Sequence, residues 1–172
     1  MKLHSRKGLT LVELIAAVAF TAVVIAAACA VLYLGAHSFK SGTSNAVNQQ
    51  KATLTESYLQ RYAATAFTVS SSNDGTSDGV VFALSGGTLN VQKQTVSNGV
   101  KTMEPLISVD GIARIKLNIV NGTLNYAIVS ADETYTLEGG IVLNNVESGS
   151  VSDMTGENST VLFFGTKQPS AG

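Results

Sequence analysis

The sequence predicts an α+β protein, in which one long N-terminal helix precedes an antiparallel β-sheet. From Leu14 to Ala36 no residue carries a formal charge, and this run exceeds the roughly 20 apolar residues that a membrane-spanning helix needs. A helical spacing of apolar residues resumes at Thr43, and beyond residue 78 the pattern changes to the alternation of β-strands. Helix and strands that are segregated along a chain are typical of the α+β class.

The composition of the part beyond the apolar run excludes several function classes. From Gly42 onward seven Lys and Arg stand against eleven Asp and Glu, so no basic surface is expected and direct nucleic-acid binding is not predicted. The two histidines, His4 and His37, and the single cysteine, Cys29, all lie in or beside the apolar run. The remainder therefore lacks the commonest catalytic bases, nucleophiles and metal ligands, which argues against an enzyme, a metal or a cofactor.

The N-terminus combines a basic head with one carboxylate in an apolar helix. Lys2, Arg6 and Lys7 precede Gly8, and Glu13 follows within the apolar segment. An ionisable residue in a membrane helix is costly and indicates a function with a partner charge. A cut after Gly8 would give Leu9 a free amine. That amine could neutralise Glu13 in the same helix or in a parallel neighbour that is displaced by about one turn.

The stretch Lys7-Gly8-Leu9-Thr10-Leu11-Val12-Glu13-Leu14 resembles the leader junction of type IV prepilins and pseudopilins. The resemblance covers roughly the first 35 residues, in which charge, glycine, glutamate and apolar length all agree. It implies that a prepilin peptidase and methyltransferase cuts after Gly8 and methylates Leu9. It also implies that Glu13 guides assembly into a filament of pilin subunits at an assembly platform.

Three departures from the family's usual pattern stand out. The first mature residue would be Leu9, where phenylalanine is usual, and Ala30 occupies a position where major pilins often carry proline. Without proline the helix has no cause to kink there. Many major pilins also close a C-terminal loop with a disulfide, which the single Cys29 does not allow.

The resemblance divides the chain into a cleaved leader (1–8), a transmembrane and filament-core helix (9–37) and an exported pilin-like domain (38–172). The basic head places the N-terminus in the cytoplasm and the domain outside. The implied function is that of a minor pilin or pseudopilin in a type IV pilus, a type II secretion system or a competence filament. Alternatives are an adhesin or DNA-uptake module of such a filament, or an anchored domain that does not assemble.

The apolar run has two other readings. Ala26-Ala27-Ala28 offers small residues before a signal-peptide cut, and Ala28-Cys29 faintly resembles a lipoprotein site. Glu13 would then lie in the hydrophobic region of the signal, where a charge is unfavourable. The second reading is a plain signal anchor without a role in a filament.

The exported domain is predicted to contain an amphipathic helix (43–67) and a β-sheet (78–165). Val47, Leu54, Tyr58 and Tyr62 form the helix stripe that we expect to pack on the sheet. Gly86-Gly87 and Asn121-Gly122 are two-residue hairpin turns. They predict the pairs Leu84–Leu89, Phe82–Val91, Ile119–Leu124, Leu117–Tyr126 and Ile115–Ile128.

Residues between these elements are predicted to form loops and short strands. Segments 69–79, 94–104 and 144–158 are expected as loops, Gly139-Gly140 as a turn, and 105–109, 134–138 and 159–164 as short strands. In the first loop Asn73, Asp74 and Asp78 carry oxygen ligands suited to calcium, although their spacing is not that of an EF-hand. A solvated turn is the favoured interpretation of that loop.

Overall fold

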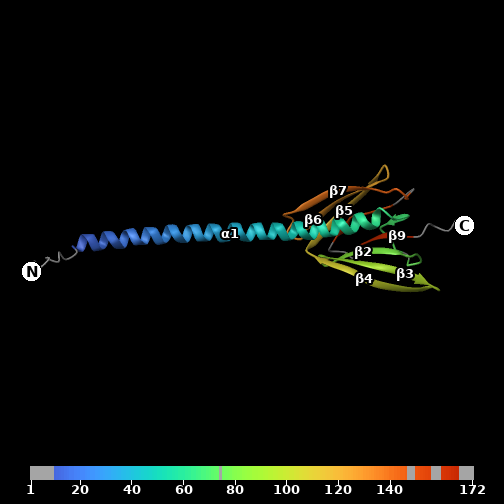
Figure 1. Ribbon diagram of the computed structural model, residues 1–172, viewed down its shortest axis with the longest axis horizontal. Coiled ribbons are helices and arrows are strands. Elements are labelled where there is room, and N and C mark those ends of the chain that lie inside the picture. The colour runs from blue at the N-terminus through green and yellow to red at the C-terminus, as the bar shows by residue number, and fades with distance from the viewer. Residues whose placement is uncertain (1–9, 74, 147–149, 156–159, 167–172) are drawn as a thin grey trace, which may run out of the picture. The chain divides into compact units, whose positions relative to one another are not determined.

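The structure, a computed structural model, describes residues 10–73, 75–146, 150–155 and 160–166. The chain divides into two compact units, Met1–Ser44 and Asn45–Gly172. Helix α1 (Leu11–Ala63) supplies the described part of the first unit and the beginning of the second (Figure 1). The predicted α+β class is confirmed, because α1 is followed by β-strands that pair antiparallel in two sheets.

Helix α1 runs without interruption through Gly35 and Gly42. Each glycine costs a helix about 1 kcal/mol relative to alanine, which the long flanking runs of good helix formers offset. The helix ends at Ala63, before the predicted end near Phe67. Beyond it the amide of Phe67 donates to the carbonyl of Gly165, so the chain has already turned to join the sheet.

The strands form two antiparallel sheets, where the sequence predicted one. The five-stranded sheet has the order β1-β9-β2-β3-β4 and the four-stranded sheet the order β7-β6-β5-β8. The strands of the first are β1 (Thr68–Ser70), β2 (Gly79–Ser85), β3 (Thr88–Ser97), β4 (Val100–Asp110) and β9 (Thr160–Gly165). Those of the second are β5 (Ile112–Val120), β6 (Thr123–Ser130), β7 (Thr136–Val142) and β8 (Met154–Thr155).

Both predicted hairpins are confirmed in register. Across Gly86-Gly87, Leu84 pairs with Leu89 and Phe82 with Val91. Across Asn121-Gly122, the three predicted pairs from Ile119–Leu124 to Ile115–Ile128 are all present. Asn121 and Gly122 both have positive φ, 51° and 73°, as the tight hairpin turn requires.

Strand residues lie within several of the predicted loops, and the segment 94–104 is mostly strand. The segment 94–104 is built from the end of β3, a turn at Asn98-Gly99 and the start of β4. Its polar side chains suit exposed strands as well as a loop, and the second Asn-Gly turn was overlooked. Gly139-Gly140 lies inside β7 and is no turn. Segment 69–79 contributes Val69 and Ser70 to β1, and β8 lies within 144–158.

The chain passes from one sheet to the other between β4 and β5. Gly111 has a φ of +78°, a conformation that other residues adopt at a cost. The amide of Ile112 then donates to the carbonyl of Gly87, and the amide of Ala131 donates to that of Gly111. This crossing splits the strands into two layers instead of one continuous sheet.

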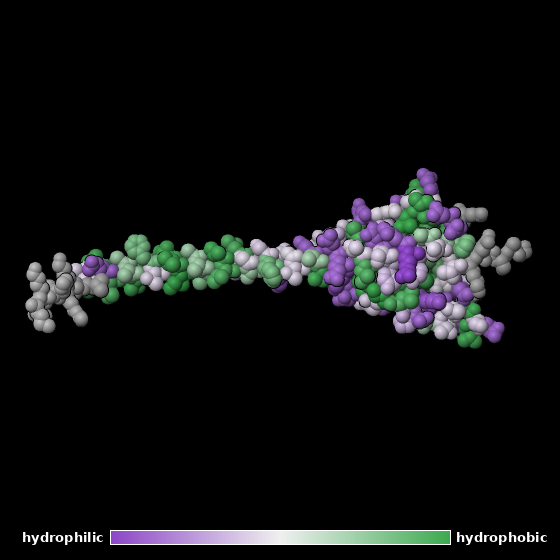
Figure 2. Space-filling model, viewed as in Figure 1, coloured by the Kyte–Doolittle hydropathy of each residue, from purple (hydrophilic) through white to green (hydrophobic). Residues whose placement is uncertain are grey.

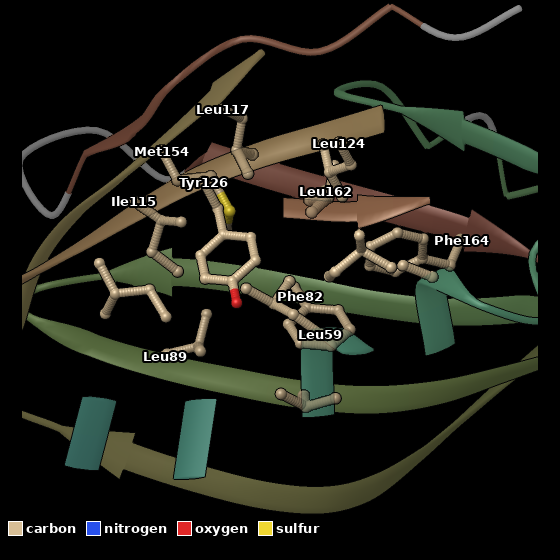
Figure 3. Close-up of a cluster of buried hydrophobic side chains, with 14 of the residues drawn as sticks. Leu59, Phe82, Leu89, Ile115, Leu117, Leu124, Tyr126, Met154, Leu162 and Phe164 are labelled. Atoms are coloured by element: carbon tan, nitrogen blue, oxygen red, sulfur yellow. The ribbon is translucent and has the colours of Figure 1, made fainter. Parts of the chain in front are cut away.

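The core of the second unit lies between α1 and the two sheets (Figure 3). Helix α1 buries Ala52, Thr55, Leu59 and Ala63. The predicted stripe was therefore wrong by a small rotation, since Val47 and Leu54 are exposed and Tyr58 and Tyr62 only half-buried. Small residues at 52 and 63 let the helix approach the sheets closely. Leu59 fills the centre beside Phe82, which packs edge-on to Phe164 at a ring separation of 5.3 Å.

Candidate functional site

The start of α1 is capped by three reciprocal hydrogen bonds between Thr10 and Glu13. The hydroxyl oxygen of Thr10 accepts from the amide of Glu13 at 3.3 Å. Glu13 Oε2 in turn accepts from the amide of Thr10 at 2.9 Å and from its hydroxyl at 3.0 Å. This is a capping box, with threonine at the N-cap and glutamate three residues later. The sequence contains its Thr-x-x-Glu signature, but the role of Thr10 was not predicted.

The predicted cleavage residues Gly8 and Leu9 lie outside the described residues, so Glu13 is the member of the predicted site that the structure places. Its carboxylate accepts hydrogen bonds at the amide of Thr10, the residue that follows Leu9 in the chain. The carboxylate is therefore directed toward the start of the helix and not along it.

The first unit exposes an apolar helix surface. Figure 2 shows this part of α1 mostly in the hydrophobic colour. Large apolar side chains such as Leu11, Phe20 and Leu32 are each more than 70% exposed. The most apolar window of the helix has a mean hydropathy of 2.7, with none of it buried. The helix is therefore long and apolar enough to cross a membrane. Cys29 lies on this surface as an exposed free thiol.

In the second unit two exposed polar contacts attach α1 to the end of β4 and to the loop that follows β6. Asn48 Nδ2 donates to both carboxylate oxygens of Asp132, at 3.0 and 2.8 Å. Lys51 Nζ lies 3.0 Å from Asp110 Oδ2. Hydrogen bonds from Ser130, and then from Asn48 and Thr134, hold the pKa of Asp132 well below its usual range. The hydrogen bond and charge of Lys51 lower the pKa of Asp110.

A third contact attaches α1 to the middle of the four-stranded sheet. The hydroxyl of Tyr126 donates to Glu56 Oε1, to which Gln60 Nε2 also donates at 3.3 Å. Burial, followed by this bond to a carboxylate, raises the pKa of Tyr126 to about 12. The ring lies over Gly139 of β7, where a Cβ atom would stand 2.2 Å from the hydroxyl oxygen. These groups serve the packing of the helix, with no free nucleophile or base among them.

The loop considered for calcium uses its oxygens internally. Asn73 Oδ1 accepts from the amide of Gly75 and from Gln94 Nε2, and Asp78 Oδ1 accepts from the amide of Val96. Asp74 lies outside the described residues. Within the described part of the chain no group of three or more His, Cys, Asp or Glu side chains is placed to hold a metal ion.

An open hollow of about 420 Å³ lies on the face of the four-stranded sheet that bears Lys116 and Glu138. These two charges flank Ala127 in one cross-strand row, and Asp153 also lines the hollow. Asp153 Oδ1 accepts a hydrogen bond from the amide of Leu117. This bond to the backbone of β5 explains why the Asp153 side chain lies there. The hollow exists because two of its lining residues are small, Ala127 at the centre of this row and Gly139 at the centre of β7.

Comparisons of the chain with protein-family models, with curated proteins and with solved structures found no match. What the residues themselves establish is a long apolar N-terminal helix, closed at its start by Thr10 and Glu13, that continues into an antiparallel β unit.

Proposed function

We propose that the chain is a structural subunit of a membrane-assembled filament, a minor pilin or pseudopilin of the type IV pilus, type II secretion or competence kind. The observation that carries the proposal is the junction from Lys7 to Glu13 at the head of an exposed apolar helix. An anchor alone has no need of a carboxylate there, because a charge in a membrane helix is unfavourable, by about 2.5–3.5 kcal/mol at mid-depth and by less near the interface.

In this proposal the chain first inserts with its basic head in the cytoplasm and its β unit outside. A prepilin peptidase then cuts between Gly8 and Leu9, and the new amine of Leu9 becomes the partner of Glu13. The placement of the Glu13 carboxylate at the amide of Thr10 supports this step, since the new amine would belong to the adjacent residue. The apolar surface of α1 would then exchange lipid for the helices of neighbouring subunits.

Intact-mass analysis of protein extracted from membranes tests the first step. We expect a mature chain that lacks residues 1–8, with Leu9 at its N-terminus. Gly8→Leu should leave the chain full length, because a side chain at this position obstructs the close approach of the peptidase to the backbone. A mature N-terminus at Cys29 that carries lipid would overturn the proposal and establish the lipoprotein alternative.

A further inference from the structure

Strand β7 is a sheet edge with a free row of backbone groups. Among the described strands it pairs with β6 alone, at the end of the four-stranded sheet. The amide of Ser130 donates to the carbonyl of Tyr135, and the amide of Leu143 donates to that of Gly122. Because hydrogen-bonded pairs alternate in an antiparallel ladder, the odd residues of β7 bond to β6. The backbone groups of its even residues therefore point away from the sheet, and these residues are Thr136, Glu138, Gly140 and Val142.

Strand β4 is the corresponding edge of the five-stranded sheet, where it pairs with β3. The two-residue turn at Asn98-Gly99 starts this ladder with a hydrogen-bonded pair. The amides and carbonyls of Lys101 and Met103 consequently point outward. Pro105 has no amide, and a shift of register follows it, features with which natural sheets prevent edge-to-edge pairing. The part of β4 that remains open to a new strand is residues 100–104.

Strand β7 runs in the same direction as helix α1. In the loop before β7, Asp132 contacts Asn48 of the helix. Within β7, Gly139 lies against the ring of Tyr126, whose hydroxyl donates to Glu56, further along the helix. Progress along the strand therefore matches progress along α1.

Strand β4 runs in the opposite direction to α1. Its last residue, Asp110, contacts Lys51 of the helix. Earlier in β4, Ile107 shares a cross-strand row with Phe82, whose ring packs against Tyr62 near the end of α1. Figure 1 shows β4 and β7 on opposite sides of α1. Two copies whose helices point the same way can therefore place β7 of one beside β4 of the other as antiparallel neighbours.

We propose that β7 of one copy pairs antiparallel with the open part of β4 in a second copy of this chain, with both α1 helices in the same direction. Glu138 lies opposite Lys101 of the second copy, and Thr136 lies opposite Met103. All four residues have outward backbone groups, so about four backbone hydrogen bonds form, two for each pair. The inference rests on the proposed function, because a filament assembled from one membrane keeps its helices in one direction.

Charge and proline select this register. Glu138 and Lys101 are exposed, and no described residue forms a hydrogen bond or ion pair with either side chain. Opposite charges directly across a ladder stabilise it. A slide by two residues in one direction places Thr136 opposite Pro105, which has no amide to donate. A slide in the other direction places Lys101 opposite Thr136 and leaves Met103 beyond the start of β7.

The contact is open-ended, because it joins two different edges of the chain. A copy whose β7 is paired still has a free β4. The register also displaces the copies along α1. Lys101 lies roughly 30 Å along β4 from Asp110, which contacts Lys51, whereas Glu138 lies next to the strand position that faces Glu56. The resulting displacement is roughly 20 Å, and a displacement along the axis produces a helical array instead of a closed ring.

Disulfide formation in filaments tests the pairing and leaves the charge pair intact. In a Cys29→Ser background, Met103→Cys and Thr136→Cys are combined, and sheared surface filaments are oxidised. Residues in a hydrogen-bonded antiparallel pair have Cα atoms about 5.5 Å apart, within the range that a disulfide spans. Within one chain the two residues belong to different sheets on opposite sides of α1, so each bridge joins two copies. We expect a ladder of dimers, trimers and longer products on a non-reducing gel.

Three controls accompany the double variant. Either single variant should give no ladder, because its cysteine faces a residue without a thiol. Filaments that contain both single variants should stop at dimers, since each copy then carries one cysteine. Met103→Cys combined with Val142→Cys is the control for register and should give about tenfold less product, because Val142 lies about 20 Å from Thr136 along the strand.

Reversal of one charge tests the partner of Glu138. Glu138→Lys, added to the double cysteine variant, places two ammonium groups opposite each other, which is destabilising. We expect about tenfold less ladder. Adding Lys101→Glu exchanges the two charges and should restore the ladder. A ladder that Glu138→Lys leaves unchanged would show that the two charges do not meet.

Filaments of the unaltered chain provide a measurement that needs no substitution. A carbodiimide joins a carboxylate to an adjacent amine as an amide, with loss of water to the reagent. It should link Glu138 to Lys101, and mass spectrometry of the digested product identifies the linked peptides. Absence of this link from filaments that contain the chain would overturn the pairing, whether or not the cysteine variants assemble.

These results distinguish a failure of the pairing from a failure of the proposed function. If the double variant reaches filaments and gives no more ladder than the control for register, the pairing of β7 with β4 is wrong and the filament function stands. If the unaltered chain is absent from sheared filaments, the proposed function fails and the pairing fails with it. A ladder that the charge exchange restores supports both.

Discussion

The hydroxyl of Tyr126 on β6 donates a hydrogen bond to the carboxylate of Glu56 on α1. This bond joins the helix to the centre of the four-stranded sheet. The tyrosine ring reaches that position because it lies over Gly139, its pairing partner on β7, which has no side chain to displace it. Helix α1 and the consecutive strands β6 and β7 are thereby held together by a glutamate, a tyrosine and a glycine.

Tyr126→Phe should destabilise the second unit by about 1–2 kcal/mol. A hydrogen bond to a charged group contributes about 1.5–3 kcal/mol, and the loss is smaller here because Gln60 and water still solvate Glu56. Urea denaturation followed by circular dichroism measures this change. Tyr58→Phe is the matched control, because no described residue hydrogen-bonds to the Tyr58 hydroxyl, and it should have little effect. Equal stability of Tyr126→Phe and the unaltered chain would show that the bond contributes nothing to folding.

The same tyrosine predicts a pH dependence in the alkaline range. The folded state raises its pKa from 10.0 to about 12, so folding favours the protonated hydroxyl. The resulting stability is present below pH 10 and is lost as the pH rises through about 12. The difference in unfolding free energy between the unaltered chain and Tyr126→Phe should therefore shrink over this range. A difference that stays constant from pH 9 to pH 12 would contradict the assignment of the raised pKa.

Gly139→Ala should be more destabilising than Gly140→Ala. A Cβ atom at residue 139 would lie 2.2 Å from the Tyr126 hydroxyl oxygen and 2.5 Å from its ring carbon. The buried ring would have to move and release Glu56, at a cost of about 1–3 kcal/mol, which is typical of overpacking. At residue 140 the nearest atoms are ends of the Asn125 and Thr123 side chains at 3.2 Å, and small shifts relieve them. Thermal unfolding of both variants provides the comparison.

Substitutions at Glu13 separate the charge of this residue from its role in capping the helix. Glutamine also serves at the third position of a capping box, so Glu13→Gln keeps the contact with Thr10 and loses the charge. We expect both Glu13→Gln and Glu13→Ala to insert in the membrane and to be absent from sheared surface filaments. The readout is the amount of the chain in filaments relative to the amount in membranes.

Thr10→Ala is the matched test of helix capping. It removes the N-cap hydroxyl, at a cost of about 0.5–2 kcal/mol of helix stability, and keeps the Glu13 carboxylate. Assembly of Thr10→Ala with failure of Glu13→Gln would assign the function to the charge, whereas the reverse result would assign it to the cap. If both Glu13 variants reach filaments at normal levels, Glu13 is not an assembly carboxylate, and a plain signal anchor becomes the better reading.

The sequence alone determined the features that arise from local chemistry. Asn121-Gly122 and Gly86-Gly87 favour tight turns by their own backbone preferences, and a turn of set length specifies the register of both strands that it joins. The uncharged run from Leu14 to Ala36 needs only its composition to be read as a helix that can cross a membrane. The capping box at Thr10 and Glu13 is equally local and could have been predicted from its spacing.

Only the tertiary structure decided which surfaces meet. The buried side of α1 is centred on Leu59 and Ala63 and not on Leu54, because close approach to two sheets favours small side chains that amphipathic spacing alone does not select. Gly139-Gly140 continues a strand because the ring of Tyr126 occupies the space above Gly139, a contact between β6 and β7 that turn statistics do not contain. The crossing at Gly111 divides the strands into two sheets. That division depends on packing between residues far apart in the chain, whereas sequence patterns report neighbours along it.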